Sequence, residues 1–104
     1  ACGDTVYLSG QIPLVPGSMT LVEGDLAAEV GQVLDNLAAV AEAAGGSLDQ
    51  MVKLTVYFTE LGDFGTINEV MLARFSVPFP ARAAIEVAGL PKGARVEIDG
   101  IMVR

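Results

Sequence analysis

The chain has 104 residues and a net charge of −7; 52% of its residues are hydrophobic and 18% are charged. This length predicts one domain, residues 1–104, with a core of its own. So acidic a chain is not expected to bind a nucleic-acid backbone, which draws affinity from Lys and Arg. Histidine is absent, which excludes a His-based triad, a His-ligated metal and a histidine general base.

Several other classes of site are not expected either. No apolar run reaches the ~18 residues that a membrane span requires. Neither a Walker A nor a GxGxxG motif is present, and the carboxylates lack metal-ligand spacing, so no cofactor and no metal are predicted. Cys2 is the only cysteine and fits a reducing compartment, which favours a cytoplasmic protein. The chain starts at Ala1 without Met, so upstream residues are expected to be missing.

The first elements in chain order are a strand and a long loop. Residues 5–9 have the composition of a strand, which we expect Gly10 to end. Residues 13–24 contain Pro, Gly and Ser and predict a loop, with a short strand near 19–22.

The clearest helix follows. Asp25 is a plausible N-cap, and Gly45 with Gly46 supplies the C-terminal stop. Ser47 and Gln50 resemble a capping box for one short turn. The apolar residues between these signals recur mostly at steps of three and four, which is typical of one buried helix face: Leu26, Val30, Val33, Leu34, Leu37, Val40, Ala41 and Ala44.

The second half predicts a strand, a helix and two further strands. Residues 52–59 alternate between apolar and polar, which indicates a half-buried strand. Asp63 can cap a second helix whose apolar stripe is Phe64, Ile67, Met71 and Phe75. Strands are expected at 82–87 and 94–103, joined by a turn rich in Gly and Pro. The order β-β-α-β-α-β-β predicts an α+β fold, one sheet with both helices on one face.

Arg82 is the strongest candidate for a functional residue. Its surroundings, 77–87, are otherwise almost wholly apolar, and Pro78 and Pro80 fix the backbone just before it. A guanidinium in such a place needs an anionic partner, and its fork geometry favours a carboxylate. The partner is either an internal carboxylate such as Glu86 or a small acid from solution.

Three other places carry polar groups that fit a site. Glu97 alternates with apolar neighbours, so it lies either on a solvated strand face or at a subunit boundary. The turn Ser9, Gly10 and Gln11 offers backbone N–H groups, a hydroxyl and an amide, although an ordinary strand end has the same pattern. Asn68 is polar on the second helix, where simple solvation is the common outcome.

Taken in order, five segments resemble the RidA (YjgF) family over nearly the whole chain. They are Ser9-Gly10-Gln11-Ile12-Pro13, Asp63-Phe64 with Ile67-Asn68-Glu69, Pro80-Ala81-Arg82, Leu90-Pro91-Lys92-Gly93, and Val96-Glu97-Ile98. The resemblance implies a chorismate-mutase-like fold, a homotrimer with a central barrel, and clefts between subunits. It also implies hydrolytic deamination of reactive enamines and imines such as 2-aminoacrylate, a detoxification of reactive metabolites that needs no cofactor.

The resemblance also implies roles for single residues. Arg82 matches the arginine that binds the substrate carboxylate, and Glu97 matches a glutamate that helps to place water. The 9–11 turn matches a segment that lines the same cleft, and Asn68 matches a polar residue near it. Two features differ from the family pattern: its N-terminal tyrosine segment would precede this chain, and Ala84 stands where many members have cysteine.

Two functions from different classes therefore compete. The first is hydrolysis of a 2-imino acid to a 2-keto acid and ammonia, with Arg82 and Glu97 as catalytic residues. The alternative is a regulatory module that binds small carboxylates in the same cleft without turnover. The acidic charge disfavours a third function, ribonuclease or translation inhibitor, an old label in this family.

Overall fold

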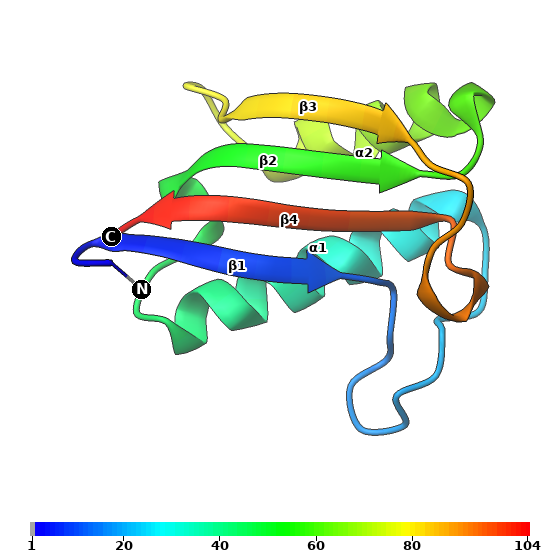
Figure 1. Cartoon of the computed structure of the whole chain (residues 1–104), viewed down its shortest axis with the longest axis horizontal. Coiled ribbons are helices and arrows are strands. Elements are labelled where there is room, and N and C mark those ends of the chain that lie inside the picture. The colour runs from blue at the N-terminus through cyan, green and yellow to red at the C-terminus, as the bar shows by residue number, and fades with distance from the viewer. Residues whose placement is uncertain (1) are drawn as a thin grey trace.

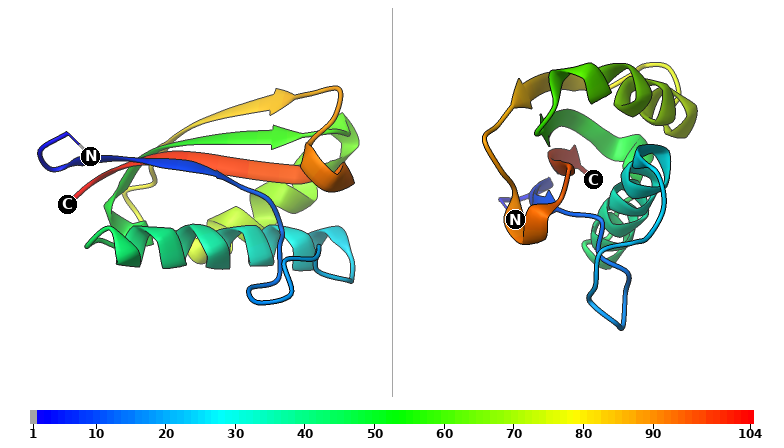
Figure 2. Two further views of the ribbon diagram at one scale, coloured as in Figure 1. Left: turned by 60° about the horizontal axis from the view of Figure 1, so that its bottom comes forward. Right: turned by 90° about the vertical axis from the view of Figure 1, so that its right-hand side faces the viewer.

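The computed structural model describes residues 2–104 as a four-stranded sheet with two helices packed on one of its faces (Figures 1 and 2). The elements are β1 (Thr5–Gln11), α1 (Leu26–Ala43), β2 (Met51–Phe58), α2 (Phe64–Arg74), β3 (Ala81–Glu86) and β4 (Val96–Val103). Short 3-10 turns lie at η1 (Leu48–Gln50), η2 (Leu61–Asp63) and η3 (Pro91–Gly93). This arrangement confirms the predicted α+β fold with both helices on one side.

The sheet is mixed, and its strand order is β1-β4-β2-β3. β4 pairs antiparallel with both β1 and β2, whereas β2 and β3 are parallel. A parallel pair needs a crossover connection, and α2 supplies it. Figure 1 shows the consequence that matters for function: β1 and β3 form the two opposite edges of the sheet.

Two local predictions at helix and loop boundaries are wrong. No strand forms near 19–22: the loop makes only an isolated bridge between Leu14 and Leu21, and Met19 has a left-handed φ of 56° that interrupts an extended chain. Asp63 makes no side-chain cap hydrogen bond, because it is already in the helical conformation as the last residue of η2. The predicted cap Asp25 is confirmed, since its Oδ1 accepts a hydrogen bond of 2.9 Å from Ala28 N.

A single core fills the space between the helices and the sheet. The apolar stripe of α1 packs against inward residues of β2 and β4, and the large side chains that are 1% exposed or less include Leu34, Leu37, Leu54, Phe58 and Ile98. Alternation along β2 and β4 places the other half of their side chains on the opposite face. Figure 2 shows that both helices lie on one side of the sheet. One face of the sheet is therefore left uncovered by this chain.

One charged pair ties the start of β4 to the first turn of α1. Glu29 is the one charged side chain buried in the described part of the chain, at 7% exposure. Arg95 binds its Oε2 through both Nε and Nη2. Because a buried carboxylate without a partner is costly, this pair fixes the position of Arg95, which immediately precedes β4 and lies two residues before Glu97.

We expect Arg95→Met to lower the free energy of unfolding by about 1.5–3 kcal/mol, because it leaves the Glu29 carboxylate buried without its charged partner. The matched control is Arg74→Met, which breaks the more exposed pair with Asp35 and should cost less than about 1 kcal/mol. Urea unfolding at one protein concentration measures both. Equal losses for the two variants would contradict the structural role of Arg95.

Candidate functional site

Arg82 points toward α2 from the edge strand β3. It stands in register beside Leu54 of β2, whose side chain is buried under the helices, so both side chains lie on the helix side of the sheet. Its Nη1 donates a hydrogen bond of 2.6 Å to Asn68 Oδ1. Its guanidinium carbon lies 5.3 Å from the centre of the Phe64 ring. Two residues one turn apart on α2 thus hold the guanidinium in place.

The guanidinium has no carboxylate partner among residues 2–104. The ion pairs found there join Arg74 to Asp35 and Arg95 to Glu29. The internal pairing with Glu86 is not formed, because Glu86 lies four residues farther along the extended strand β3. Its carboxylate instead accepts a hydrogen bond of 2.9 Å from Leu61 N. Asn68 is neutral, so it orients the charge of Arg82 without compensating it. In the single chain Arg82 is exposed and available to an acid from solution.

Phe64 is a member of this group that sequence reasoning did not assign to the site. The apolar stripe counted it as core, and it does pack against Phe58 with ring centres 6.0 Å apart. Its ring also attracts the cation of Arg82, an interaction worth about 0.5–2 kcal/mol depending on solvent exposure. The available signal was the four-residue spacing between Phe64 and Asn68, which places both on one helix face.

Glu97 lies on the opposite face of the sheet. Its partner on β2 is Tyr57, and the residues on either side of Tyr57 are buried under the helices, so Glu97 projects from the open face. There it lies against Gly10: a β-carbon on Gly10 would collide with the Glu97 carboxylate. A larger residue at position 10 would therefore displace the flexible end of the Glu97 side chain. Ser9, which precedes it, is exposed.

Gln11 extends the first strand beyond its predicted end. β1 continues through Gly10, and Gln11 pairs with Ile98 after a bulge. The Gln11 amide donates to its own strand, to Ser9 O at 3.1 Å. The side chain lines a hollow of about 260 Å³ between the 12–19 loop and α1.

Four of the predicted site residues, together with Phe64, therefore fall into two groups. Arg82, Asn68 and Phe64 form a cationic group on the helix side of the edge strand β3. Glu97 and Gly10 form an acidic group on the open face, toward the other edge. A single chain does not bring the two groups together.

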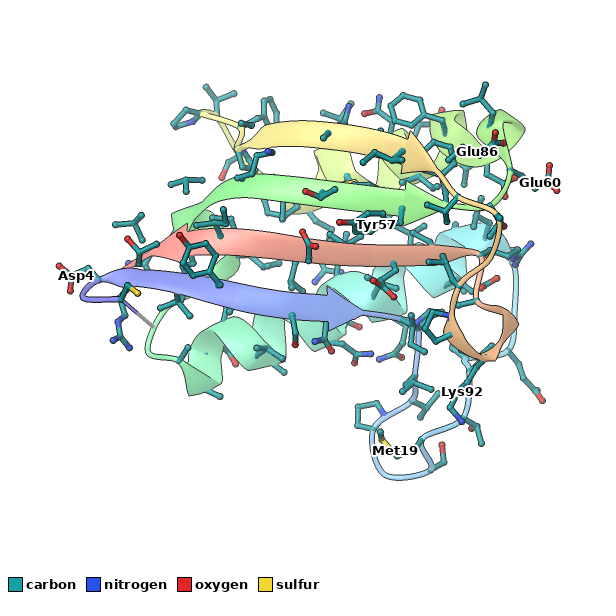
Figure 3. The ribbon with its side chains drawn as sticks, in the orientation of Figure 1. Asp4, Met19, Tyr57, Glu60, Glu86 and Lys92 are labelled. Atoms are coloured by element: carbon teal, nitrogen blue, oxygen red, sulfur yellow. The ribbon has the colours of Figure 1, made fainter. Side chains whose placement is uncertain are left out.

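The acidic group extends to a second carboxylate on the same face. Tyr57 donates a hydrogen bond of 3.1 Å from its hydroxyl to Asp99 Oδ2, and Figure 3 shows Tyr57 on the face turned away from the helices. This hydrogen bond, then burial and the charges of Asp99 and Glu97, raise the pKa of Tyr57 above its ordinary value of 10.0. The open face thus favours neutral or cationic neighbours over anionic ones.

Residues 2–104 contain neither a metal-binding cluster nor a membrane-spanning helix. No cluster of three or more His, Cys, Asp or Glu side chains there could hold a metal ion. No helix in that range is long and apolar enough to cross a membrane.

Comparison with known proteins places these features in one family. The model of the endoribonuclease L-PSP family matches residues 1–104. A rat protein named 2-iminobutanoate/2-iminopropanoate deaminase is 47% identical over 96% of this chain and 73% of its own length. Protein DfrA of Myxococcus xanthus is 46% identical over 97% and 77%. The crystal structure of RidA from an Antarctic Psychrobacter has a TM-score of 0.95 and 50% identity, covering 100% of this chain and 84% of that one.

The Tyr57–Asp99 hydrogen bond predicts a measurable titration. With Tyr7→Phe, Tyr57 becomes the only tyrosine, and its phenol absorbance should titrate with a midpoint above 10.0. Adding Asp99→Asn should lower the midpoint toward that value. Because the folded-state pKa is raised, its stabilising contribution is complete below about pH 10 and is lost as pH rises through the folded midpoint. Asp49→Asn is the control, and a midpoint unmoved by Asp99→Asn would contradict the assignment.

Proposed function

Because this chain belongs to the RidA/YjgF family, whose endoribonuclease L-PSP model matches it from end to end, we propose that it hydrolyses 2-imino acids of the 2-aminoacrylate type to 2-keto acids and ammonia. The observation that carries this proposal is the Arg82 guanidinium, which Asn68 and Phe64 hold and which no carboxylate of the described residues neutralises. Relatives named 2-iminobutanoate/2-iminopropanoate deaminase support the reaction class.

The proposed reaction requires only that the protein orient the substrate and supply a proton acceptor. Arg82 binds the carboxylate of the imino acid through two parallel hydrogen bonds, which fixes the neighbouring imine carbon. Glu97 orients a water and takes its proton as the oxygen attacks that carbon, giving a carbinolamine. Glu97 passes this proton to the nitrogen, which completes the carbinolamine. Glu97 then takes the hydroxyl proton and delivers it to the nitrogen as the C–N bond breaks, so that ammonia leaves as the C=O forms. General acid–base help of this kind is worth about 10²–10⁴-fold in rate.

The site we propose is completed by a second copy of the chain. Arg82 lies at the β3 edge on the helix side, and Glu97 with Gly10 lies toward the β1 edge on the open face. A neighbour that sets its β1 edge beside β3 would bring its Glu97 to the carboxylate held by Arg82. Head-to-tail contacts of this kind close into rings. The homotrimer stays a prediction, and it would give each ring several identical clefts.

A second candidate function is binding without turnover. The carboxylate-binding group of Arg82, Asn68 and Phe64 is complete within one chain and does not need Glu97. A regulatory module that holds a keto acid would require only this half of the site.

Replacing Arg82 by Ala should lower kcat/KM for freshly generated 2-aminoacrylate by about 100-fold or more, since two hydrogen bonds to a charged group are lost and each is worth about 1.5–3 kcal/mol. Arg82→Lys keeps the positive charge but not the forked guanidinium, so its kcat/KM should lie between those of the wild type and Arg82→Ala. Arg74→Ala is the matched control. Pyruvate and ammonia release measures all of them. Full activity of Arg82→Ala would refute the role, while keto-acid binding by a wild type that does not accelerate hydrolysis would select the binding module.

The two-copy site predicts complementation between inactive variants. Co-expressed Arg82→Ala and Glu97→Gln chains should regain activity, because about a quarter of randomly mixed clefts receive an intact residue from each copy. The control pairs Arg82→Ala with the Arg82→Ala/Glu97→Gln double variant, a mixture with no intact Arg82. If the first mixture is no more active than this control, Arg82 and Glu97 do not serve one site from two copies.

A further inference from the structure

An apolar cleft lies beside Arg82, between α2 and the segment that leads into β3. Its volume is about 310 Å³, near the lower end of the range for small-molecule sites. The residues that line it include Leu54, Met71, Leu72, Phe75 and Phe79, and Arg82 is the one charged residue among those that do. The cleft is therefore a hydrocarbon surface with a single cation at its margin.

The exposure of the lining residues shows which part of the cleft is open. Leu54 is 1% exposed and Met71 3%, so both belong to the packed core and form an apolar floor. Leu72 and Phe79 are each 50% exposed and stand at the rim. Large apolar side chains that stay half exposed around a hollow gain free energy when a ligand covers them.

We propose that this cleft receives the apolar side chain of the acid whose carboxylate Arg82 binds, so that the preferred ligands are 2-imino and 2-keto acids with a branched or extended hydrocarbon side chain. The inference rests on the function proposed above. In such an acid the carboxylate and the side chain leave the reacting carbon in different directions. A carboxylate on the free N–H groups of Arg82 thus leaves the tail free to enter the cleft.

The chemistry of the cleft selects against other occupants. A second anionic or strongly polar group would meet no cation besides Arg82 and would lose its hydration against Leu and Phe side chains. The Asn68 amide oxygen is already occupied by Arg82 Nη1. The lining therefore fits a monocarboxylate with an apolar body, and each further carbon buried there should tighten binding.

The test compares two stable keto acids that share a head group. 2-Oxobutanoate carries an ethyl side chain, and 4-methyl-2-oxopentanoate carries an isobutyl side chain. Calorimetry on the wild-type protein should give about tenfold tighter binding of the isobutyl acid, because two more carbons are buried. Leu72→Gln and, independently, Phe79→Ala should reduce this preference several-fold, because the longer isobutyl group loses more apolar contact than the ethyl group of 2-oxobutanoate.

Leu61→Gln is the matched control, since Leu61 is 66% exposed and does not line the cleft. Thermal melting checks that each variant is folded, and Gln suits the helical position of Leu72. Suppose that the wild type binds the two acids with equal affinity and that Arg82→Ala binds neither. This result would refute the proposal that the cleft receives the side chain, and the proposed function would remain. Binding of neither acid, or binding unchanged by Arg82→Ala, would overturn both.

Discussion

The site depends on the way in which the Arg82 guanidinium is held: its neighbours fix its position but do not neutralise its charge. Asn68 offers Arg82 a carbonyl oxygen and Phe64 offers a ring face, and neither carries a charge. Both contacts fix the guanidinium at small cost in side-chain entropy once a ligand arrives. A protein carboxylate in their place would have held the guanidinium equally well, but it would have neutralised the charge that binds a ligand. The fold thus supplies orientation and leaves the charge for a ligand.

Sheet topology explains why one chain carries only half of the proposed catalytic machinery. The crossover through α2 makes β3 parallel to β2 and lays α2 beside the β3 edge, which is how Asn68 and Phe64 reach Arg82. Alternation along β4 directs Glu97 to the other face. No rotamer change carries a side chain through a sheet whose core is packed, so a second copy is the simplest way to join the two groups.

Local sequence patterns were sufficient to predict the helices and strands. The arrangement of the site depends on contacts between residues that are far apart in the sequence. Alternation located the strands around 51–58 and 96–103, and helical spacing with Asp25 located α1, because these features depend on near neighbours. Two local predictions were wrong. Asp63 ends the 3-10 turn η2 and makes no capping hydrogen bond, and the residues near 19–22 form an isolated bridge in place of a strand. The pairing of Arg82 with Asn68 spans 14 residues across a crossover, so no local period could reveal it. The family resemblance named Asn68 but not its contact.

The overall charge limits what this arginine can bind. Of the 6 basic residues, Arg74 and Arg95 are occupied by Asp35 and Glu29, while the net charge of the chain is −7. An approaching anion therefore meets repulsion from the molecule as a whole, which is screened beyond about 8–10 Å at physiological salt. Attraction begins only at contact, where the guanidinium fork is geometrically matched to one carboxylate. A ligand with several negative charges gains one such contact and suffers repulsion on every charge, whereas a monocarboxylate gains the same contact and adds apolar burial. The electrostatics and the apolar cleft thus favour the same kind of small acid.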